Sequence, residues 1–501
     1  MAEKSLSGES LAGPRRGTID QSGPTALGAD RRAAGVVGFL LFLVEAAVLC
    51  WPTLLNQGAV LVFPDTRSYF VAGRAALTKG LALLWPHGGG LAGTAPSEAA
   101  IQQARMVRSA FYSLFTYVTS APLSLWVAVG IQAMLLAAVL KLIFELICPQ
   151  RPRWHATGFI VTLALLTTAS WVACNAMPDV FAPIAALSAI MLLLFWNRLQ
   201  PVGRVALFVL VAVSCMMHLS IPPVVLGLAG IGALMHPRRL WRQRSRYLTV
   251  GIAVVVALGA TLAASVIGFK QWTLTPNGPP FLLARSLDDG PGKLYLREHC
   301  PQIGLDMCKH LDRLDVGDDD FIWHQNGVYS AVPLKEAAVL RTEDKRIYLA
   351  AALEHPWMQL RAIIGNSLHQ LGLFTLREYF IPSHAYADPD HPPDLFTMYI
   401  RPVEPAWQMY LAIPEYLIVI VGLVYGCWLW VRGSLGAIDR SALILVFVAV
   451  SVNAFVCAFS IPSPRYEARV IWLIPMIALL FYSKAGSGGH GERDRGTRSA
   501  E

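Results

Sequence analysis

The chain has 501 residues, of which 55% are hydrophobic and only 15% are charged, whereas a soluble globular protein carries about a quarter charged residues. This composition excludes an ordinary soluble protein. The net charge of +8 does not indicate nucleic-acid binding, because the arginines gather in short segments between apolar runs, where they orient a membrane protein. We therefore expect membrane lipids, and no nucleic acid, among its partners.

Ten apolar runs along the chain predict membrane-spanning helices. A spanning helix needs about 20 mainly apolar residues, and a helix satisfies its own backbone groups in lipid. We therefore expect an all-α polytopic membrane protein with about ten transmembrane helices. The runs lie at residues 34–55, 122–147, 156–175, 178–196, 204–218, 221–236, 247–268, 408–431, 441–460 and 468–484.

The polar segments between these runs divide the chain into parts. Both ends are rich in Gly, Ser and Arg, and we expect the first to be disordered. The parts are a tail at 1–33, a transmembrane region at 34–268 with a first loop at 57–121, a larger loop at 269–407, the C-terminal transmembrane helices at 408–484 and a second tail at 485–501.

Arginines mark the turns on one side of the predicted bundle. Arg151 and Arg153 lie in one such turn, whereas the next turn, residues 174–178, contains no Lys or Arg. Basic residues are retained on the cytoplasmic side of a membrane. The alternation therefore predicts that both termini are cytoplasmic and that the loops at 57–121 and 269–407 lie on the opposite face.

The eight cysteines fall into two groups. Six lie in or beside apolar runs, where cysteine behaves as a small hydrophobe. Cys300 and Cys308 lie together in the large polar loop. If that loop faces an oxidising compartment, a disulfide between them is expected. The alternative is a pair of free thiols.

Two acids, a histidine and two arginines gather at the loop-bearing face. Asp65 follows the first span, Asp179 lies in the turn before the fourth, and His218 closes the fifth. Arg465 and Arg469 lie at the approach to the last span. Guanidinium groups match phosphate oxygens with a planar fork, and a carboxylate can act as general base for a hydroxyl. The set therefore suits a substrate that carries a phosphate.

Each of these residues also has a structural interpretation. Asp65 and Asp179 both follow a proline and could cap the helices that begin there. His218 could be a packed histidine at the membrane interface. Arg465 and Arg469 could extend toward lipid head groups. Their joint presence at one face favours the functional interpretation.

Short motifs resemble the integral-membrane glycosyltransferases of the GT-C superfamily. The first loop carries an acid, in Phe-Pro-Asp65-Thr-Arg-Ser-Tyr, and the fourth span opens with Met-Pro-Asp179-Val-Phe. The pair Arg465-Tyr466 opens a last span that contains Pro475. The resemblance is to the bacterial branch near the protein mannosyltransferases and the lipid A aminoarabinose transferases, and it covers most of the layout of the spans.

The resemblance implies a sugar transferase of the bacterial inner membrane. Its donor would be a polyprenyl-phosphate-linked sugar, and its acceptor a lipid, a glycan or a protein bound from the periplasmic side. Asp65 would be the base or the carboxylate that orients the acceptor, and Asp179 the second acid. The implied substrate-binding residues are Arg108, Tyr112, His218, Arg465, Tyr466 and Arg469.

The chain also departs from the family pattern. Many members carry paired acids in the first loop, whereas Thr66 and Arg67 follow Asp65 here. The loop at 269–407 matches no pattern, which leaves the acceptor open.

No cofactor is expected. The chain has no phosphate-loop, dinucleotide, HExxH or GxSxG motif. Nothing in the spacing of His384, Asp388, Asp390 and His391 supports a divalent metal. The acidic run at 318–320 indicates a solvated turn, and the alternatives are a site for a divalent ion or for a basic acceptor.

Two other functions remain open. One is a polytopic transporter or flippase for a lipid-linked or glycan substrate, and the other is an inactive GT-C-like membrane protein. Transporters commonly show two similar halves. The arrangement of spans about the large loop is asymmetric, which favours the transferase.

Overall fold

The protein is built from helices. The structure is a computed structural model that describes residues 24–84, 109–235, 237, 243–276, 278–324, 327–380 and 408–485. Within these residues there is no β-sheet, and β pairing is limited to an isolated parallel bridge between Leu61 and Asn175. The predicted all-α class is confirmed.

Six helical segments of the described chain are long and apolar enough to cross a membrane, which indicates a multi-pass membrane protein. Each corresponds to a predicted span. They are α6 (Leu125–Ile147), α9 (Phe181–Phe195) with the 3-10 turns η2 (Pro178–Val180) and η3 (Trp196–Arg198), α13 (Arg244–Phe269), α20 (Gln408–Val431), α21 (Ala437–Cys457), and α22 (Pro464–Ile471) continued by α23 (Leu473–Ala485).

The other four predicted spans coincide with shorter apolar helices. They are the apolar part of α1 (Pro24–Val48), α7 (Arg153–Leu166), α10 (Pro201–Met217) and α11 (Ile221–Met235). The predicted third span at 156–175 is wrong in its length. Thr167 is extended and ends α7, and a separate short helix, α8 (Ala169–Ala173), follows.

The last span begins earlier than predicted. Ser463 has an extended backbone and Pro464 occupies the first helical position, where a proline costs no backbone hydrogen bond. Arg465 therefore lies on a helix, α22, and not in the turn before one.

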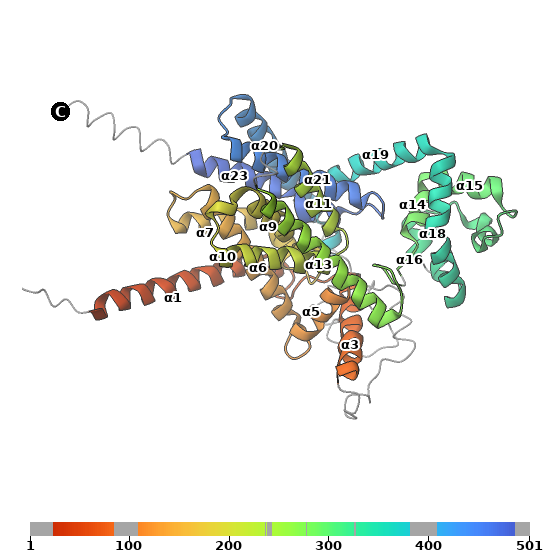
Figure 1. Cartoon of the computed structure of the whole chain (residues 1–501), viewed down its shortest axis with the longest axis horizontal. Coiled ribbons are helices and arrows are strands. Elements are labelled where there is room, and N and C mark those ends of the chain that lie inside the picture. Colours follow the sequence, from red (N-terminus) through yellow and green to blue (C-terminus); the bar gives the residue numbers. More distant parts are fainter. Residues whose placement is uncertain are drawn as a thin grey trace, which may run out of the picture.

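A separate helical unit stands at one end of the bundle. It comprises residues 278–354 and is joined to the bundle by α19 (Pro356–Gly372) and η5 (Arg377–Phe380) (Figure 1). The start of α1 and the end of α23 lie at the opposite end of the bundle (Figure 1). The helices of the unit are α14 (Phe281–Asp289), α15 (Pro291–His299), η4 (Asp306–Arg313), α16 (Asp318–Trp323), α17 (Val328–Ala331) and α18 (Leu334–Glu354).

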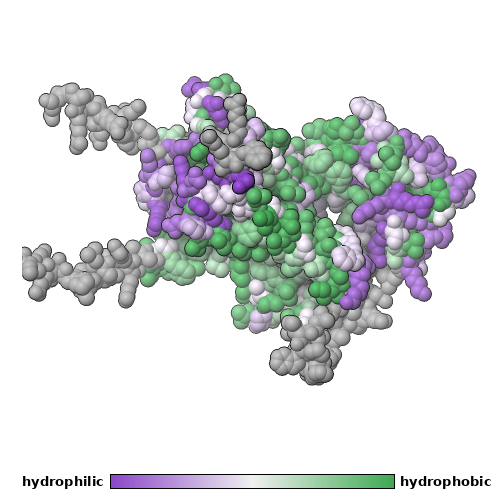
Figure 2. Space-filling view, in the orientation of Figure 1, coloured by the Kyte–Doolittle hydropathy of each residue, from purple (hydrophilic) through white to green (hydrophobic). Residues whose placement is uncertain are grey.

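The helical unit has its own hydrophobic core and a disulfide. Apolar side chains such as Leu283, Phe321 and Leu340 are fully buried in a cluster that is separate from the core of the bundle. Cys300 and Cys308 are joined by a disulfide. Figure 2 shows polar side chains over this unit and a broad apolar surface over the bundle.

A buried arginine links the helices of the unit. Arg285 on α14 donates to Asp318 on α16 at 2.5 Å and to Asp289 at 2.8 Å, and it also pairs with Asp288. Asp318 is only 8% exposed. The prediction of a solvated turn at 318–320 is therefore wrong at Asp318, because Arg285 supplies the partner that a buried carboxylate requires.

The first loop folds back onto the bundle as a helical pair. α3 (Pro64–Leu84) packs against α5 (Ala110–Ser120). The two backbones approach so closely at Gly73 that a Cβ there would lie 2.0 Å from the carbonyl oxygen of Ser113. Only glycine fits this crossing, which fixes α3, and with it Asp65 in its first turn.

Two carboxyl groups of the helical unit have raised pKa values. Burial raises the pKa of Asp318 to about 6, although Arg285 opposes the shift. Burial also raises the pKa of Asp344 to about 6, although the backbone N–H of Leu283 donates to it at 2.6 Å. The folded unit therefore binds these protons more tightly than the unfolded chain does. The resulting stabilisation is present below the unfolded pKa and is lost as the pH rises through about 6.

We expect Asp344→Asn to raise the melting temperature of the helical unit at about pH 7.5 and to change it less at about pH 5. The amide oxygen can still accept from Leu283, while the cost of burying a charge is removed. The full chain in detergent is heated, and unfolding of the unit is detected as tryptic cleavage within residues 278–354. This gives the change in the melting temperature of the helical unit. The control is Asp315→Asn, an exposed carboxylate that accepts from Arg297 at 2.8 Å. Equal shifts in both variants would contradict the assignment.

Candidate functional site

The segments that precede the two acids are hydrogen-bonded to each other. The backbone N–H of Leu61 donates to Cys174 at 3.1 Å, and the N–H of Ala176 donates to Leu61 at 2.9 Å. The hydroxyl of Thr66 donates to the carbonyl oxygen of Ala176 at 3.1 Å. These contacts bring the start of α3, with Asp65, beside the turn that leads to Asp179.

Neither acid is the N-cap residue of its helix. α3 begins at Pro64, so Asp65 lies inside its first turn. η2 begins at Pro178 with Met177 as its N-cap, and Asp179 is 2% exposed. The N-cap interpretation of Asp65 is therefore wrong, whereas Asp179 does lie in the turn that opens the fourth span. Both carboxylates also have partners elsewhere in the chain.

Those partners are the two arginines of α22. Arg465 and Arg469 are four residues apart, so they project from one face of the helix. Arg465 Nη2 lies 3.9 Å from Asp65 Oδ2, and its Nε lies 3.7 Å from Asp179 Oδ2. Arg469 Nη1 lies 3.3 Å from Asp179 Oδ1. Asp179 thus lies between two cations, and Arg465 lies between two carboxylates.

Arg469 has a full set of partners and no exposed surface. Its Nε and Nη2 donate to Asn453 Oδ1 at 3.0 and 2.7 Å, and Nη2 also donates to Ser220 Oγ at 2.8 Å. Ser220 Oγ in turn lies 2.8 Å from His218 Nδ1. His218 therefore joins the cluster through Ser220, and Arg469 connects α21 and α22 to the turn between α10 and α11.

Arg465 is different, because part of its guanidinium lacks hydrogen-bond partners. It is 5% exposed, and its Nε and Nη1 make no hydrogen bond within the described part of the chain. Its guanidinium carbon lies 3.9 Å from the ring centre of Phe63 and 5.0 Å from that of Tyr466. Buried N–H groups are nearly always satisfied. Arg465 therefore keeps N–H groups that no described residue satisfies.

The end of the large loop also contacts this cluster, and no local pattern in the sequence predicts that contact. Glu378 on η5 accepts from the hydroxyl of Ser463 at 2.6 Å and from the backbone N–H of Arg465. Gln370 on α19 binds the backbone of Ser463 twice, donating to its carbonyl at 2.9 Å and accepting from its N–H at 3.0 Å. These two residues hold the N-terminus of α22, which carries both arginines and is called the arginine helix below.

Burial dominates the electrostatics of this loop end. It raises the pKa of the Glu378 carboxyl, against the opposing effects of Ser463 and Arg465. Tyr379 is buried beside it, close enough to Asp179 and Arg465 for their charges to act on its hydroxyl. That hydroxyl has no hydrogen-bond partner among the described residues. The site therefore contains a third carboxyl and a phenol that sequence reasoning missed.

The remaining predicted residues have different positions. Tyr466 presents its ring to both arginines, at 5.0 Å from Arg465 and 5.3 Å from Arg469. Tyr112 is fully buried and donates to Gln132 at 2.9 Å, so it supports the wall of the site. Arg108 lies outside the described residues, as do the four residues weighed above as metal ligands.

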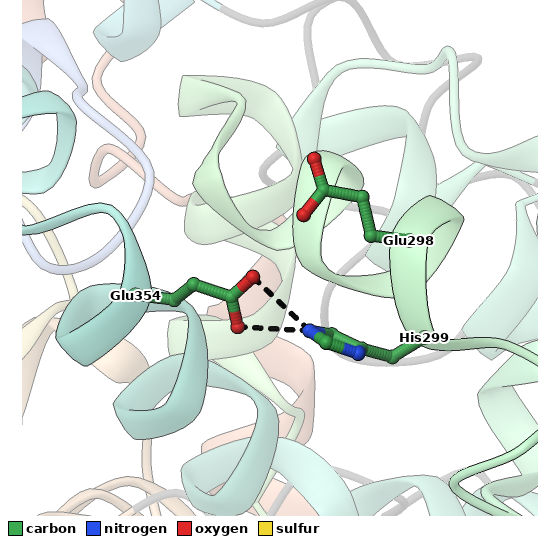
Figure 3. A group of neighbouring side chains, drawn as sticks. All are labelled: Glu298, His299 and Glu354. Carbon is green, nitrogen blue, oxygen red and sulfur yellow. Dashed lines mark hydrogen bonds and ion pairs between the residues drawn. The ribbon is translucent and has the colours of Figure 1, made fainter.

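A group of possible metal ligands lies far from this cluster in the sequence. Glu298, His299 and Glu354 come together at the surface of the helical unit (Figure 3). The imidazole Nε2 of His299 lies 2.9 Å from Glu354, and this contact lowers the pKa of Glu354. A hydrogen bond between the imidazole and the carboxylate accounts for the approach of His299 and Glu354.

Comparison with known proteins gives no relative: no family model, no curated protein and no solved structure matches the chain.

We expect Gln370→Leu to loosen the start of α22 while the bundle stays folded. The change removes both hydrogen bonds to Ser463 and leaves its backbone groups without partners, which costs about 1–3 kcal/mol. Amide hydrogen exchange of the full chain measures this, as an acceleration of about 5- to 150-fold in residues 463–469. His369→Leu changes the adjacent exposed residue and serves as the control. Unchanged exchange in Gln370→Leu would show that Gln370 does not stabilise the start of α22.

Proposed function

We propose that the protein is a GT-C-like glycosyltransferase that moves a sugar from a polyprenyl-phosphate donor to an acceptor hydroxyl. One observation carries the proposal. Arg465 is buried between Asp65 and Asp179, yet two of its N–H groups lack hydrogen-bond partners among the described residues. An anion-binding guanidinium beside a carboxylate is the combination that phosphate departure and hydroxyl activation require.

The residues have separate roles in the proposed reaction. The acceptor oxygen attacks the anomeric carbon and forms the new glycosidic bond. The bond from that carbon to the phosphate oxygen breaks, and its electron pair leaves with the lipid phosphate. Asp65 takes the proton of the acceptor hydroxyl, and Arg465 stabilises the charge that develops on the phosphate. Asp179 keeps both arginines in place.

The arrangement of the bundle supports the proposed topology. The start of α1 and the end of α23 lie at the end opposite the helical unit (Figure 1). Counting the four shorter apolar helices as spans gives ten crossings, with both termini in the cytoplasm of a bacterium and the helical unit in its periplasm. The unit then stands beside the site on the side from which a lipid, glycan or protein acceptor approaches.

We expect Asp65→Asn to reduce sugar transfer by about 10²- to 10⁴-fold, because an amide cannot accept the acceptor proton. We expect Asp179→Asn to reduce it as well, because both arginines lose their shared partner. Membranes containing equal amounts of each variant are incubated with radiolabelled polyprenyl-phosphate sugar, and transfer is counted.

The matched control is Asp439→Asn, which alters a buried carboxylate paired with Lys484 of α23 at 2.8 Å, on the same helix, α21, that carries Asn453 of the site. It should leave transfer near the wild-type rate. Wild-type transfer by Asp65→Asn would contradict the assigned role. An equal loss in Asp439→Asn would assign the losses to stability.

The two arginines should respond differently to the same substitution. We expect Arg465→Lys to raise the KM for the donor by about 10- to 100-fold, the worth of one charge-assisted hydrogen bond, because lysine lacks the planar fork. Arg469→Lys should lower the amount of folded protein, because it removes bonds to Asn453 and Ser220. Steady-state kinetics in lipid nanodiscs and protein yield distinguish the two. A KM unchanged in Arg465→Lys would speak against phosphate binding there.

A further inference from the structure

The helix that joins the helical unit to the bundle has its apolar side turned outward. Four apolar side chains on α19 are between 46% and 75% exposed, and Leu353, just before it, is 82% exposed. The four are Trp357, Leu360, Ile364 and Leu368. With 3.6 residues per turn, they fall within an arc of about 80° and form a single stripe. We call these four residues the α19 stripe.

Three polar side chains of α19 point inward instead. Gln370 binds Ser463 at the start of α22, and Asn366 donates to Asp289 of the helical unit at 2.9 Å. Gln359 is 4% exposed. These three residues lie on the side of the helix opposite the stripe. A surface helix in water shows the reverse distribution, with its apolar stripe facing the core.

The stripe is continuous with the apolar surface of the bundle. α19 packs against α21, a candidate span on which Phe455 is 47% exposed. α19 and the end of α13 extend from the bundle toward the same side, and Figure 2 shows apolar surface where α19 leaves the bundle. At the end of α13, Ile267 is 57% exposed and Trp272, just beyond, 83%.

We propose that the α19 stripe is embedded in the lipid leaflet on the side of the helical unit. Lipid accounts for both halves of the pattern, because acyl chains cover the apolar stripe while the polar face binds the protein. Trp357, at the end of α19 near the unit, has the residue type that is enriched where acyl chains meet head groups. The exposed Arg361 borders the stripe, about 20° around the helix from Leu368, and suits a lipid phosphate.

This placement gives α19 a mechanical role. α19 is tied to the helical unit through Asn366 and Asp289 and, one turn further along, to α22 through Gln370 and Ser463. Lipid that holds the stripe therefore sets how far the helical unit stands above the membrane. It also fixes the helix on which Arg465 lies.

The test is fluorescence quenching of the full chain in lipid nanodiscs. Cys427, the exposed free cysteine, is replaced by serine, and a bimane label is attached to single cysteines at Leu360→Cys or Leu368→Cys. His369→Cys is the neighbour control, about 100° around the helix from Leu368. Lys345→Cys, exposed on α18, is the aqueous control. Quenchers are a phospholipid with a nitroxide on its acyl chain, and iodide in the buffer.

Labels on the stripe should be quenched severalfold more by the nitroxide lipid than by iodide. The label at Lys345→Cys should show the opposite ratio, and the label at His369→Cys should be quenched less by the lipid than its neighbour. Iodide quenching of the stripe equal to that at Lys345→Cys would overturn the proposal. Shielding of the stripe from both quenchers would also overturn it, because a second copy or another segment of the chain would then cover the stripe.

Discussion

The site depends on the ion pairs that the carboxylate of Asp179 makes with Arg465 and Arg469. This carboxylate is almost fully buried, and a buried charge persists only where partners of opposite charge surround it. Arg465 and Arg469 supply those partners from the last span, so the fourth and the last predicted spans must meet at this point. The start of α3, the end of α10 and the end of the large loop contact the same cluster, through Asp65, His218 and Glu378.

The two arginines of this cluster differ in how completely the protein satisfies their N–H groups. Arg469 is held by an amide, a hydroxyl and a carboxylate, which leaves it no capacity for a ligand. Arg465 lies against aromatic rings and at longer distances from its carboxylates. The same residue type, one helical turn away, is thus satisfied by the protein in one case and keeps N–H groups without hydrogen-bond partners among the described residues in the other. Our functional proposal rests on this difference.

The helical unit and the bundle are separate cores connected through one helix. The unit is stabilised by its own apolar cluster, a disulfide and the buried pairing of Arg285 with Asp318. α19 passes from this unit to the start of the arginine helix with its polar side inward and its apolar side outward. In the proposed arrangement, lipid completes a surface that the protein leaves open.

The sequence by itself determined the apolar runs, the pairing of Cys300 with Cys308 as a candidate disulfide, and the gathering of Asp65, Asp179 and the two arginines at one face. These follow from local hydropathy and from the alternation of arginine-rich turns, which need no tertiary contact. Only the tertiary structure decided which arginine keeps open donors and that Glu378 and Gln370 hold its helix. Those contacts join residues about a hundred positions apart, and no local pattern encodes them. The break in α7 and the inward polar side of α19 were likewise fixed by neighbouring helices, because packing overrides what a short apolar run favours.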